Sequence, residues 1–226
     1  MNNVKIKDSE FFNYSNNDFL MLTSKNVLSN SGINEIVSKI NFETKNYALL
    51  EQIHSNKIIF AKDSGNKGRA DGLITHIENN LILCVMTADC FPIFIHDSKT
   101  GFFSLIHAGW RGIVSKIHKN ALLEIKRLGS KLEDVNISIG PSIKKCCFEV
   151  KNDVVNKFDN KYVIMRDNKL YINLLHNVLD DLTLLGIPMK NISFDEVCTY
   201  DDDKCCSYRR DGSKAGRMVS LITYLK

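Results

Sequence analysis

The sequence has no long apolar stretch, and this absence excludes several classes of protein. No window of the chain reaches the roughly 20 apolar residues that a membrane-spanning helix needs. The first residues include lysine, aspartate and glutamate where a secretory signal peptide would be apolar. We therefore expect a cytoplasmic protein with no membrane partner.

The chain also lacks a run of positive charge. Its 30 lysines and arginines exceed its 26 acidic residues by a net charge of +4, and they are spread along the sequence. Proteins that bind nucleic acids gather their basic residues into a stripe, often with aromatic side chains for stacking. We therefore expect no nucleic-acid partner.

Cysteine is present, but its pattern differs from that of a disulfide scaffold. The chain has seven cysteines in 226 residues, an odd number at low density. Two pairs are sequence neighbours, which form a disulfide only with strain. Reduced thiols are the simplest interpretation, and a cytosolic compartment would keep them reduced.

The composition is that of an ordinary globular protein, since 44% of the residues are hydrophobic and 25% are charged. Hydrophobic patterns predict strands at residues 81–86, 92–95, 101–106, 135–139, 192–194 and 218–225. They predict helices at residues 112–129, 152–158 and 173–185. The first three strands follow one another closely, which suggests a largely antiparallel or mixed sheet. We expect one domain over residues 1–226, of the α/β (α+β) class, with mixed, mostly antiparallel sheets flanked by helices.

Three side chains suited to a metal lie at the ends of β-like runs: His54, Cys90 and His107. Cys90 and His107 are 17 residues apart, a spacing that suits two neighbouring strands joined by a turn near Ser98. Thiolate and neutral imidazole are ligands that zinc prefers, and catalytic zinc has three protein ligands with an open fourth position. The pattern therefore indicates an enzyme.

A plainer interpretation stands beside this one. A cysteine at the end of a strand is more often a small core residue than a ligand or a nucleophile. Zinc ligation and Cys–His nucleophilic catalysis both need a thiolate near an imidazole, so Cys90 and His107 alone do not separate them. His54 favours the metal, because a catalytic dyad needs only one imidazole. We interpret the other four histidines as surface or packing residues: His76, His96, His118 and His176.

Several arginines stand near glycines. Arg111 belongs to a turn, Gly109-Trp-Arg-Gly112, that joins a strand to a helix, where backbone N–H groups and a guanidinium can hold an anion. Arg209, Arg210 and Arg217 follow in a polar region and are further candidates for a phosphate or carboxylate contact. Taken alone, the first segment is equally consistent with a glycine turn, and the later region is typical of a solvated loop.

Five of the six other cysteines offer a second, structural zinc site in principle. None of their pairs has the two-residue spacing of a zinc knuckle. We therefore interpret them as packing or loop thiols. They are Cys146, Cys147, Cys198, Cys205 and Cys206.

Several segments, in order from about residue 50 onward, together resemble the purine nucleoside phosphorylase family of the YfiH type. This family was formerly described as laccase-domain or multicopper polyphenol oxidase proteins, and it includes a bacterial peptidoglycan editing factor. The first fifty residues contain no matching motif. The matching segments are Gln52-Ile-His-Ser-Asn-Lys57, Ala70-Asp-Gly-Leu-Ile-Thr75, Thr87-Ala-Asp-Cys-Phe-Pro-Ile93, His107-Ala-Gly-Trp-Arg-Gly112, Ile139-Gly-Pro-Ser-Ile143, Cys147-Phe-Glu-Val150, Cys198-Thr199 and Ser207-Tyr-Arg-Arg-Asp-Gly212.

The resemblance implies a zinc ion held by His54, Cys90 and His107. It implies a layered α/β fold similar to that of bacterial deamidating toxins with a catalytic Cys–His pair. Members of the family phosphorolyse adenosine, inosine and methylthioadenosine to the free base and ribose 1-phosphate or its methylthio analogue, and they deaminate adenosine. The substrates would be a purine nucleoside and phosphate, with no obligate protein partner evident.

The resemblance also suggests roles for other residues. In deamination, a zinc-bound water of lowered pKa would attack the purine carbon that carries the amino group, with Asp89 as a candidate proton shuttle. In phosphorolysis, arginines would hold phosphate beneath the sugar, with Arg111 as first choice and Arg209 and Arg210 next. Copper is a less favoured metal, because a multicopper relay needs many histidines and the chain has six.

Two other functions stay open at the level of sequence. The same site could hydrolyse an amide in cell-wall precursors that carry a wrong amino acid, as the editing members of the family suggest. Alternatively, zinc could be a structural brace in a non-enzymatic binding protein, in which case protein would fill its fourth position. Only three motif residues offer themselves as ligands, which favours an enzyme.

Overall fold

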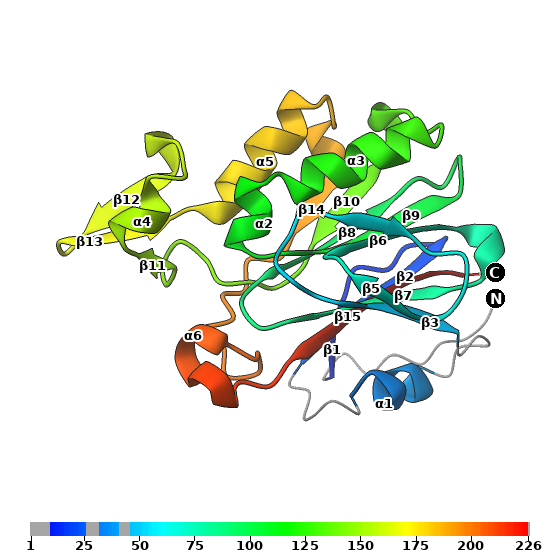
Figure 1. The fold of residues 1–226 in the computed structure, drawn as a ribbon, viewed down its shortest axis with the longest axis horizontal. Coiled ribbons are helices and arrows are strands. Elements are labelled where there is room, and N and C mark those ends of the chain that lie inside the picture. Colours follow the sequence, from blue (N-terminus) through cyan, green and yellow to red (C-terminus); the bar gives the residue numbers. More distant parts are fainter. Residues whose placement is uncertain (1–9, 26–31, 41–45, 226) are drawn as a thin grey trace.

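The computed structural model describes residues 10–25, 32–40 and 46–225, and two six-stranded sheets form its centre (Figure 1). The first sheet has the order β1 (Phe11–Asn13), β2 (Phe19–Ser24), β15 (Met218–Tyr224), β7 (Ile82–Thr87), β3 (Tyr47–Glu51) and β5 (Gly65–Arg69). The second has the order β14 (Ile192–Phe194), β10 (Asn136–Ile139), β8 (Phe91–His96), β9 (Phe102–Ala108), β6 (Gly72–His76) and β4 (Ile58–Phe60). Three of the five pairings described in each sheet are antiparallel, so both sheets are mixed, as the sequence predicts.

Helices cover the outer faces of both sheets. On the outer face of the first sheet lies α1 (Gly32–Lys39); the second sheet is covered by α2 (Trp110–Val114), α3 (Ile117–Arg127) and α5 (Leu174–Leu184) (Figure 1). A small sheet and a short helix project at one end of the molecule. The sheet has the order β11 (Glu149–Val150), β13 (Lys169–Ile172) and β12 (Val163–Arg166), and the helix is α4 (Asn152–Val155). The remaining short helices are α6 (Tyr208–Asp211), η1 (Ile77–Asn79), η2 (Leu132–Asp134), η3 (Asn160–Tyr162), η4 (Met189–Asn191) and η5 (Gly212–Lys214).

The central strands are buried on both faces. In β2, Phe19 and Met21 pack between the two sheets, whereas Leu20 and Leu22 pack in the layer under α1. Successive side chains of a strand point to opposite faces, so a strand between two apolar layers needs apolar residues at every position. This explains why the central strands appear in the sequence as continuous apolar runs.

One expectation about the strands is wrong. The three closely spaced strands between residues 81 and 106 do not share one sheet, because β7 belongs to the first sheet and β8 and β9 belong to the second. Residues 88–90 cross from one sheet to the other. The antiparallel pairing of β8 and β9 is as predicted, and it places Pro92 opposite His107.

The helix predicted over residues 112–129 is two helices. The helix is interrupted at Lys116, whose φ of 64° is left-handed, so α2 and α3 are separate. The helix predicted at 173–185 is confirmed as α5, where the side chain of Asn173 accepts a hydrogen bond from the backbone N–H of His176. The helix predicted at 152–158 is shorter than expected and ends at Val155.

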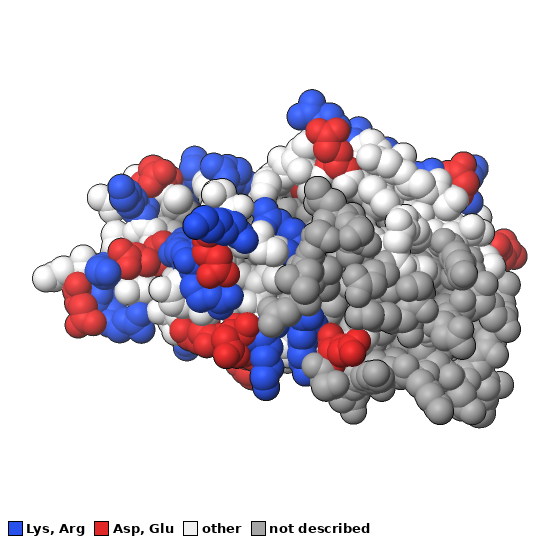
Figure 2. Space-filling view, turned by 90° about the horizontal axis from the view of Figure 1, so that it is seen from below, with Lys and Arg blue, Asp and Glu red and all other residues white. Residues whose placement is uncertain are grey.

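The surface carries charges of both signs. On the face shown in Figure 2, the lysines and arginines of the described residues lie interspersed with aspartates and glutamates. None of the helices in the described part of the chain is long and apolar enough to cross a membrane. The charged residues 1–9, on which the argument against a signal peptide depends, lie outside the described residues.

Candidate active site

The structure brings His54, Cys90 and His107 together. His54 follows β3, Cys90 precedes β8 and His107 lies in β9. One ligand atom from each of the three lies within 4.8 Å of the others. The rings of His54 and His107 have centroids 4.8 Å apart and are inclined by 73°. These three side chains could therefore hold a metal ion.

A buried carboxylate lies directly behind both histidines. Asp71, which is 0% exposed, has Oδ1 2.9 Å from Nδ1 of His107. The same carboxylate accepts the backbone N–H groups of Ile53 at 3.1 Å, His54 at 2.9 Å and Ser55 at 2.6 Å, and the hydroxyl of Ser55 at 2.8 Å. Asp71 thus orients the ring of one histidine and holds the backbone of the other, whose φ of 57° is left-handed.

These contacts determine the charges of the site. Burial disfavours ionisation of Asp71, but hydrogen bonds from His107 and Ser55 outweigh it and lower the pKa of the carboxyl to about 2. Burial also disfavours charge on His107, whereas its hydrogen bonds with Asp71 and Cys90 raise its pKa to about 9. For His54, burial and then the nearby His107 lower the pKa. A metal-binding histidine commonly gives its second ring N–H to a carboxylate, and the Asp71–His107 contact has this form.

The flanking residues of the His54 motif anchor it to neighbouring elements. The side-chain amide of Gln52 donates to the carbonyl of Met86 and accepts its N–H, both at 2.8 Å. On the other side, Asn56 donates from its side chain to the carbonyl of Ser115 at 2.9 Å. The motif is therefore fixed on both sides of the histidine.

Gly109 permits the close approach of the donor atoms. A Cβ at this position would lie 2.7 Å from Nδ1 of His54 and 3.0 Å from Sγ of Cys90. Both distances are shorter than normal van der Waals contact, so any side chain would displace two of the three candidate ligands. The need to avoid these contacts explains why position 109 is a glycine.

The three donor groups lie in a cavity of about 850 Å³. This volume is in the range of small-molecule sites. Three arginines line it: Arg111, Arg209 and Arg217. Its apolar walls include Trp110, Ile143, Phe148, Leu174 and Tyr208. The cavity can therefore accept a ligand that combines a flat apolar ring with an anionic group.

Two of the predicted arginines are held at this cavity by different means. The guanidinium of Arg111 lies 4.4 Å from the ring centroid of Trp110. Arg209 donates from Nη1 to the carbonyls of Cys147 at 3.2 Å and Glu149 at 2.8 Å. The guanidinium of Arg209 also lies 5.3 Å from the ring centroid of Phe148.

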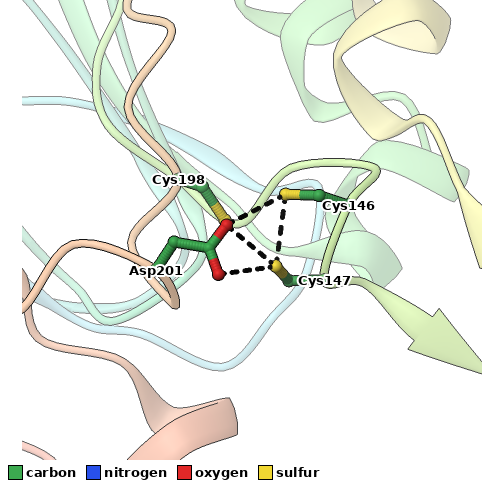
Figure 3. A group of neighbouring side chains, drawn as sticks. All are labelled: Cys146, Cys147, Cys198 and Asp201. Carbon is green, nitrogen blue, oxygen red and sulfur yellow. Dashed lines mark hydrogen bonds between the residues drawn. The ribbon is translucent and has the colours of Figure 1, made fainter.

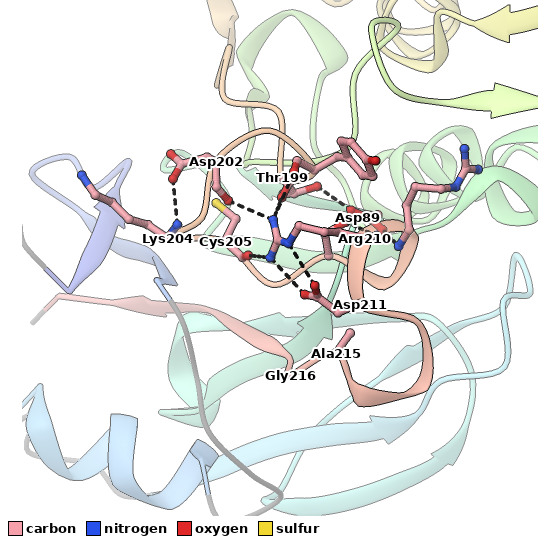
Figure 4. A network of polar contacts seen from close by, with 12 residues as sticks. Asp89, Thr199, Asp202, Lys204, Cys205, Arg210, Asp211, Ala215 and Gly216 are labelled. Carbon is pink, nitrogen blue, oxygen red and sulfur yellow. Dashed lines mark hydrogen bonds and ion pairs between the residues drawn. The ribbon is translucent and has the colours of Figure 1, made fainter.

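Arg210 does not line the cavity with them. Figure 4 shows its side chain in contact with a neighbouring loop. Its guanidinium donates to backbone carbonyls of the preceding loop and to the carboxylate of Asp211. The carbonyls are those of Thr199, Tyr200, Asp202 and Cys205. The side chain therefore closes a loop, although it directly follows a residue that lines the cavity.

Asp89 is also engaged by the protein. It is 8% exposed and has a left-handed φ of 81°. Its Oδ1 accepts the hydroxyl of Thr199 at 2.7 Å, and its Oδ2 accepts the backbone N–H of Arg209 at 2.7 Å. The carboxylate thus joins the crossing between the two sheets to the loop of Thr199 and to the start of α6 (Figure 4).

Sequence reasoning missed Asp71. The motif Ala70-Asp-Gly carried a signal, since an acidic residue directly precedes an apolar strand, but nothing in it indicated which groups the carboxylate would contact. Of the five cysteines interpreted from the sequence as packing or loop thiols, the structure gathers Cys146, Cys147 and Cys198 with Asp201. Cys205 and Cys206 pack elsewhere, near Ala88 and Met218.

The other histidines lie outside both donor groups. His118 is buried and its Nε2 is 2.8 Å from Oδ2 of Asp181. His96 is buried with its ring 4.6 Å from that of Phe19. His76 and His176 are partly exposed. These positions agree with their interpretation as surface or packing residues.

Comparison with known proteins gives one family model and relatives with two different enzyme names. The family model described as "Multi-copper polyphenol oxidoreductase laccase" matches residues 22–225. A purine nucleoside phosphorylase of Bacteroides thetaiotaomicron is 34% identical over 198 residues, which cover 83% of this chain and 73% of that protein. Another, of Clostridium acetobutylicum, is 31% identical and covers 80% of this chain and 78% of that protein. A protein named adenosine deaminase RL5, from an unknown prokaryotic organism, is 33% identical and covers 67% of this chain and 61% of that protein.

Solved structures share the fold. YfiH of Bacillus licheniformis superposes with a TM-score of 0.88 at 22% identity and covers 100% of both chains. YlmD of Geobacillus stearothermophilus gives a TM-score of 0.88 at 20% identity over 99% of both chains. The resemblance predicted from the motifs is confirmed: this chain belongs to the laccase-like YfiH family, whose model is described as a multi-copper polyphenol oxidoreductase laccase.

Proposed function

We propose that this protein is a zinc-dependent purine nucleoside phosphorylase acting at His54, Cys90 and His107. The observation that carries the proposal is the position of these three donors in one cavity, between apolar walls and arginines. A nucleoside offers a flat ring and a sugar, and phosphate offers a dianion. The names of the relatives support a purine nucleoside as substrate, and adenosine, inosine and methylthioadenosine are the candidates we propose.

The donor set suits zinc. Two imidazoles and one thiolate suit the borderline-soft zinc ion, and three protein ligands leave one position open. Asp71 supplies the carboxylate that commonly supports such a histidine. When bound, zinc would supply Lewis acidity and lower the pKa of a coordinated water. A multicopper relay is less well supported, because His54 and His107 are the only histidines of the described residues in either donor group.

The arginines at the cavity would hold the phosphate. Arg111 is supported by the face of Trp110, and Arg209 is fixed at the cavity edge by two backbone carbonyls. In phosphorolysis, a phosphate oxygen bonds to the anomeric carbon of the sugar while its bond to the purine nitrogen breaks. The electron pair leaves with the base, which takes up a proton. Positive charge fixed beside the phosphate would hold this anion against the anomeric carbon, without reorganisation of water, while the negative charge that develops on the base is neutralised by the proton.

Asp89 and Arg210 are proposed to position other groups. Both oxygens of Asp89 already accept hydrogen bonds, one of them from the backbone of Arg209. The guanidinium of Arg210 is occupied by four carbonyls and a carboxylate. We therefore assign to Asp89 the role of holding the start of α6, and with it Arg209, in place. We assign to Arg210 the role of closing the loop that precedes α6.

Deamination of adenosine is a second activity of the same proposed site. It replaces the amino group on the purine ring by oxygen from water and releases ammonia. The relative named adenosine deaminase RL5 supports this activity. The two reactions need the purine in different positions, because one acts at the glycosidic bond and the other at the far side of the ring.

The test is product analysis with purified protein whose metal content has been measured. Adenosine is incubated with and without phosphate, and the products are identified by mass spectrometry. We expect adenine and ribose 1-phosphate only when phosphate is present, and inosine in either case. The matched control is Cys90→Ala, which should form neither set of products.

Three outcomes would overturn the proposal. Full turnover and full zinc content in both Cys90→Ala and His107→Ala would remove the site from the reaction. Unchanged adenosine in the zinc-loaded protein, together with release of the amino acid from a misloaded muramyl precursor, would assign the site to amide hydrolysis. Zinc binding without either reaction would favour a structural brace.

A further inference from the structure

A second group of soft donor atoms lies outside the candidate active site (Figure 3). Cys146 and Cys147 belong to the loop between β10 and β11, whereas Cys198 and Asp201 belong to the loop after β14. One ligand atom from each residue lies within 4.8 Å of the others. Sγ of Cys147 lies 3.2 Å from Sγ of Cys146 and 3.2 Å from both carboxylate oxygens of Asp201.

The size of this group suits one tetrahedral cation. With zinc–sulfur bonds of about 2.3 Å, two sulfurs of a tetrahedral site lie about 3.8 Å apart. The four donor atoms already lie within 4.8 Å of one another, so small side-chain rotations would bring them to ligand distance. Three sulfurs among four donors select zinc or another thiophilic metal over magnesium or calcium, which prefer oxygen.

The local backbone explains how two neighbouring cysteines point to one place. The N–H groups of Cys147 and Phe148 both donate to the carbonyl of Lys144, at 3.0 Å and 2.9 Å. This tight turn brings both thiols to the same side of the loop, facing Asp201 (Figure 3). The parallel bridge between Ser142 and Cys198 holds the second loop alongside.

The backbone N–H and the ammonium group of Lys144 would offset part of the negative charge of a metal centre formed by these four side chains. Three thiolates and a carboxylate around a divalent ion carry a formal charge of −2. The backbone N–H of Lys144 donates to Sγ of Cys198 at 3.5 Å, and such outer hydrogen bonds support metal ligands. The ammonium of Lys144 is fixed nearby by the carbonyl of Asp195 at 2.6 Å and the hydroxyl of Ser142 at 3.1 Å.

Neither a disulfide nor apolar packing accounts for all four side chains. A disulfide between the neighbouring Cys146 and Cys147 is strained and leaves Cys198 and Asp201 unexplained. Apolar packing does not place a carboxylate against two half-buried thiols. A bound cation would engage all four side chains at once.

We propose that Cys146, Cys147, Cys198 and Asp201 form a second metal centre, a structural zinc site with four protein ligands. The site would join two loops that also reach the active-site cavity. The carbonyl of Cys147 accepts a hydrogen bond from Arg209, and Thr199, the neighbour of Cys198, donates to Asp89. The second metal would thus fix the wall of the cavity without touching the substrate.

The test counts zinc in the full-length, reduced protein. The chain is loaded with zinc, desalted and measured by inductively coupled plasma mass spectrometry and native mass spectrometry. We expect two zinc ions per wild-type chain, one in Cys147→Ser, one in Cys90→Ala and none in the double variant. Asp203→Asn, in the same loop as Asp201, is the matched control and should keep both ions.

Cobalt gives an independent readout of the ligands. The proposed second site has three thiolates and the first has one, so Cys147→Ser should remove more thiolate-to-cobalt charge-transfer absorption than Cys90→Ala does. Circular dichroism checks that each variant folds, and Asp201→Asn, which keeps all thiols, should lose the second ion to a chelator sooner than wild type does.

A wild-type chain that holds one zinc, lost in Cys90→Ala and kept in Cys147→Ser, would overturn the proposal. Retention of two ions in both Cys147→Ser and Asp201→Asn would do the same. Because the readout is metal content, the result does not depend on nucleoside turnover. Failure of the proposed phosphorylase activity would leave this test intact, and the reverse also holds.

Discussion

The two donor groups of this protein use similar chemistry on different supports. His54, Cys90 and His107 stand in or beside the strands of the two sheets, and the fully buried Asp71 lies behind them. Cys146, Cys147, Cys198 and Asp201 stand on two loops outside the sheets. The first group opens on a cavity with three arginines, whereas the second has enough donors to close its own coordination shell.

This difference teaches what each support is suited to. Strand ends and an adjoining loop, held by a buried carboxylate, can fix three donors and leave a fourth position for substrate chemistry, which needs precise geometry. Loops have little packing of their own, so a fourth protein ligand in a loop site contributes stability instead of reactivity. Breaking one group should therefore change rates, and breaking the other should change stability.

The largest expected effect is on turnover. Cys90→Ala should lower kcat/KM for phosphorolysis by about a thousandfold or more, because it removes a candidate metal ligand at the reacting centre. Cys147→Ser should lower kcat/KM by no more than about tenfold at 25 °C, because Cys147 lies outside the cavity lining and affects the reaction only through the loop that holds Arg209. Steady-state kinetics measures both variants. An equal loss of kcat/KM in the two variants would contradict the proposal that the first group serves catalysis and the second serves stability.

The next effect concerns the carboxylate behind the first group. Asp71→Asn should weaken zinc at that group by about 10- to 100-fold, because it removes the charge that orients His107 and replaces one of the two oxygens that accept hydrogen bonds from His107 and from the His54 motif. Competition with a chromophoric chelator measures the affinity. The exposed Asp63→Asn is a suitable control, and zinc at the second group should be unaffected. An unchanged affinity would mean that Asp71 serves folding alone.

Substitution of two arginines should distinguish a side chain that lines the cavity from one that holds a loop beside it. Arg111→Ala should raise the KM for phosphate by about tenfold and leave thermal stability near that of wild type. Arg210→Ala should leave that KM nearly unchanged and lower the free energy of unfolding by about 1–3 kcal/mol, because it frees several backbone carbonyls. Kinetics and thermal denaturation measure the two quantities. The opposite pattern would exchange the two proposed roles.

The smallest effect is the pH dependence of stability in the metal-free protein. The pKa of His107 is raised from 6.5 to about 9, so its contribution is full below pH 6.5 and is lost as pH rises through 9. The pKa of Asp71 is lowered from 3.8 to about 2, so its contribution is full above pH 3.8 and is lost as pH falls through 2. Chemical denaturation should show losses on the order of 1 kcal/mol in each window. The alkaline loss should be absent in His107→Gln, and a loss of equal size there would assign it to another group.

Much of the first group could be predicted from sequence because its elements are local. Cys90 and His107 flank a hairpin, and hairpin spacing is visible in one dimension. The pairing was predicted correctly even though β7 belongs to the other sheet. Asp71 could not be assigned a partner in the same way, since its contacts depend on a loop that folds back onto it.

The second group shows the opposite limit. A spacing rule for zinc knuckles finds cysteines that lie two residues apart, but Cys146 and Cys198 come from loops more than fifty residues apart in sequence. Arg209 and Arg210 show the same limit at the shortest range. They are neighbours in α6, yet the first lines the cavity and the second binds carbonyls of another loop. The side to which each of these two side chains points cannot be predicted from the sequence alone.

The position of β15 has a consequence for biosynthesis. This strand lies between β2 and β7 in the first sheet, although more than half of the chain separates it from β7. On the ribosome, β2 and β7 are made long before the strand that pairs with both of them. Until β15 emerges, each presents an unpaired apolar edge, so the nascent chain is exposed to aggregation and to chaperones for most of its synthesis. The sheet whose strand β3 leads into the His54 motif is thus completed among the last events of folding.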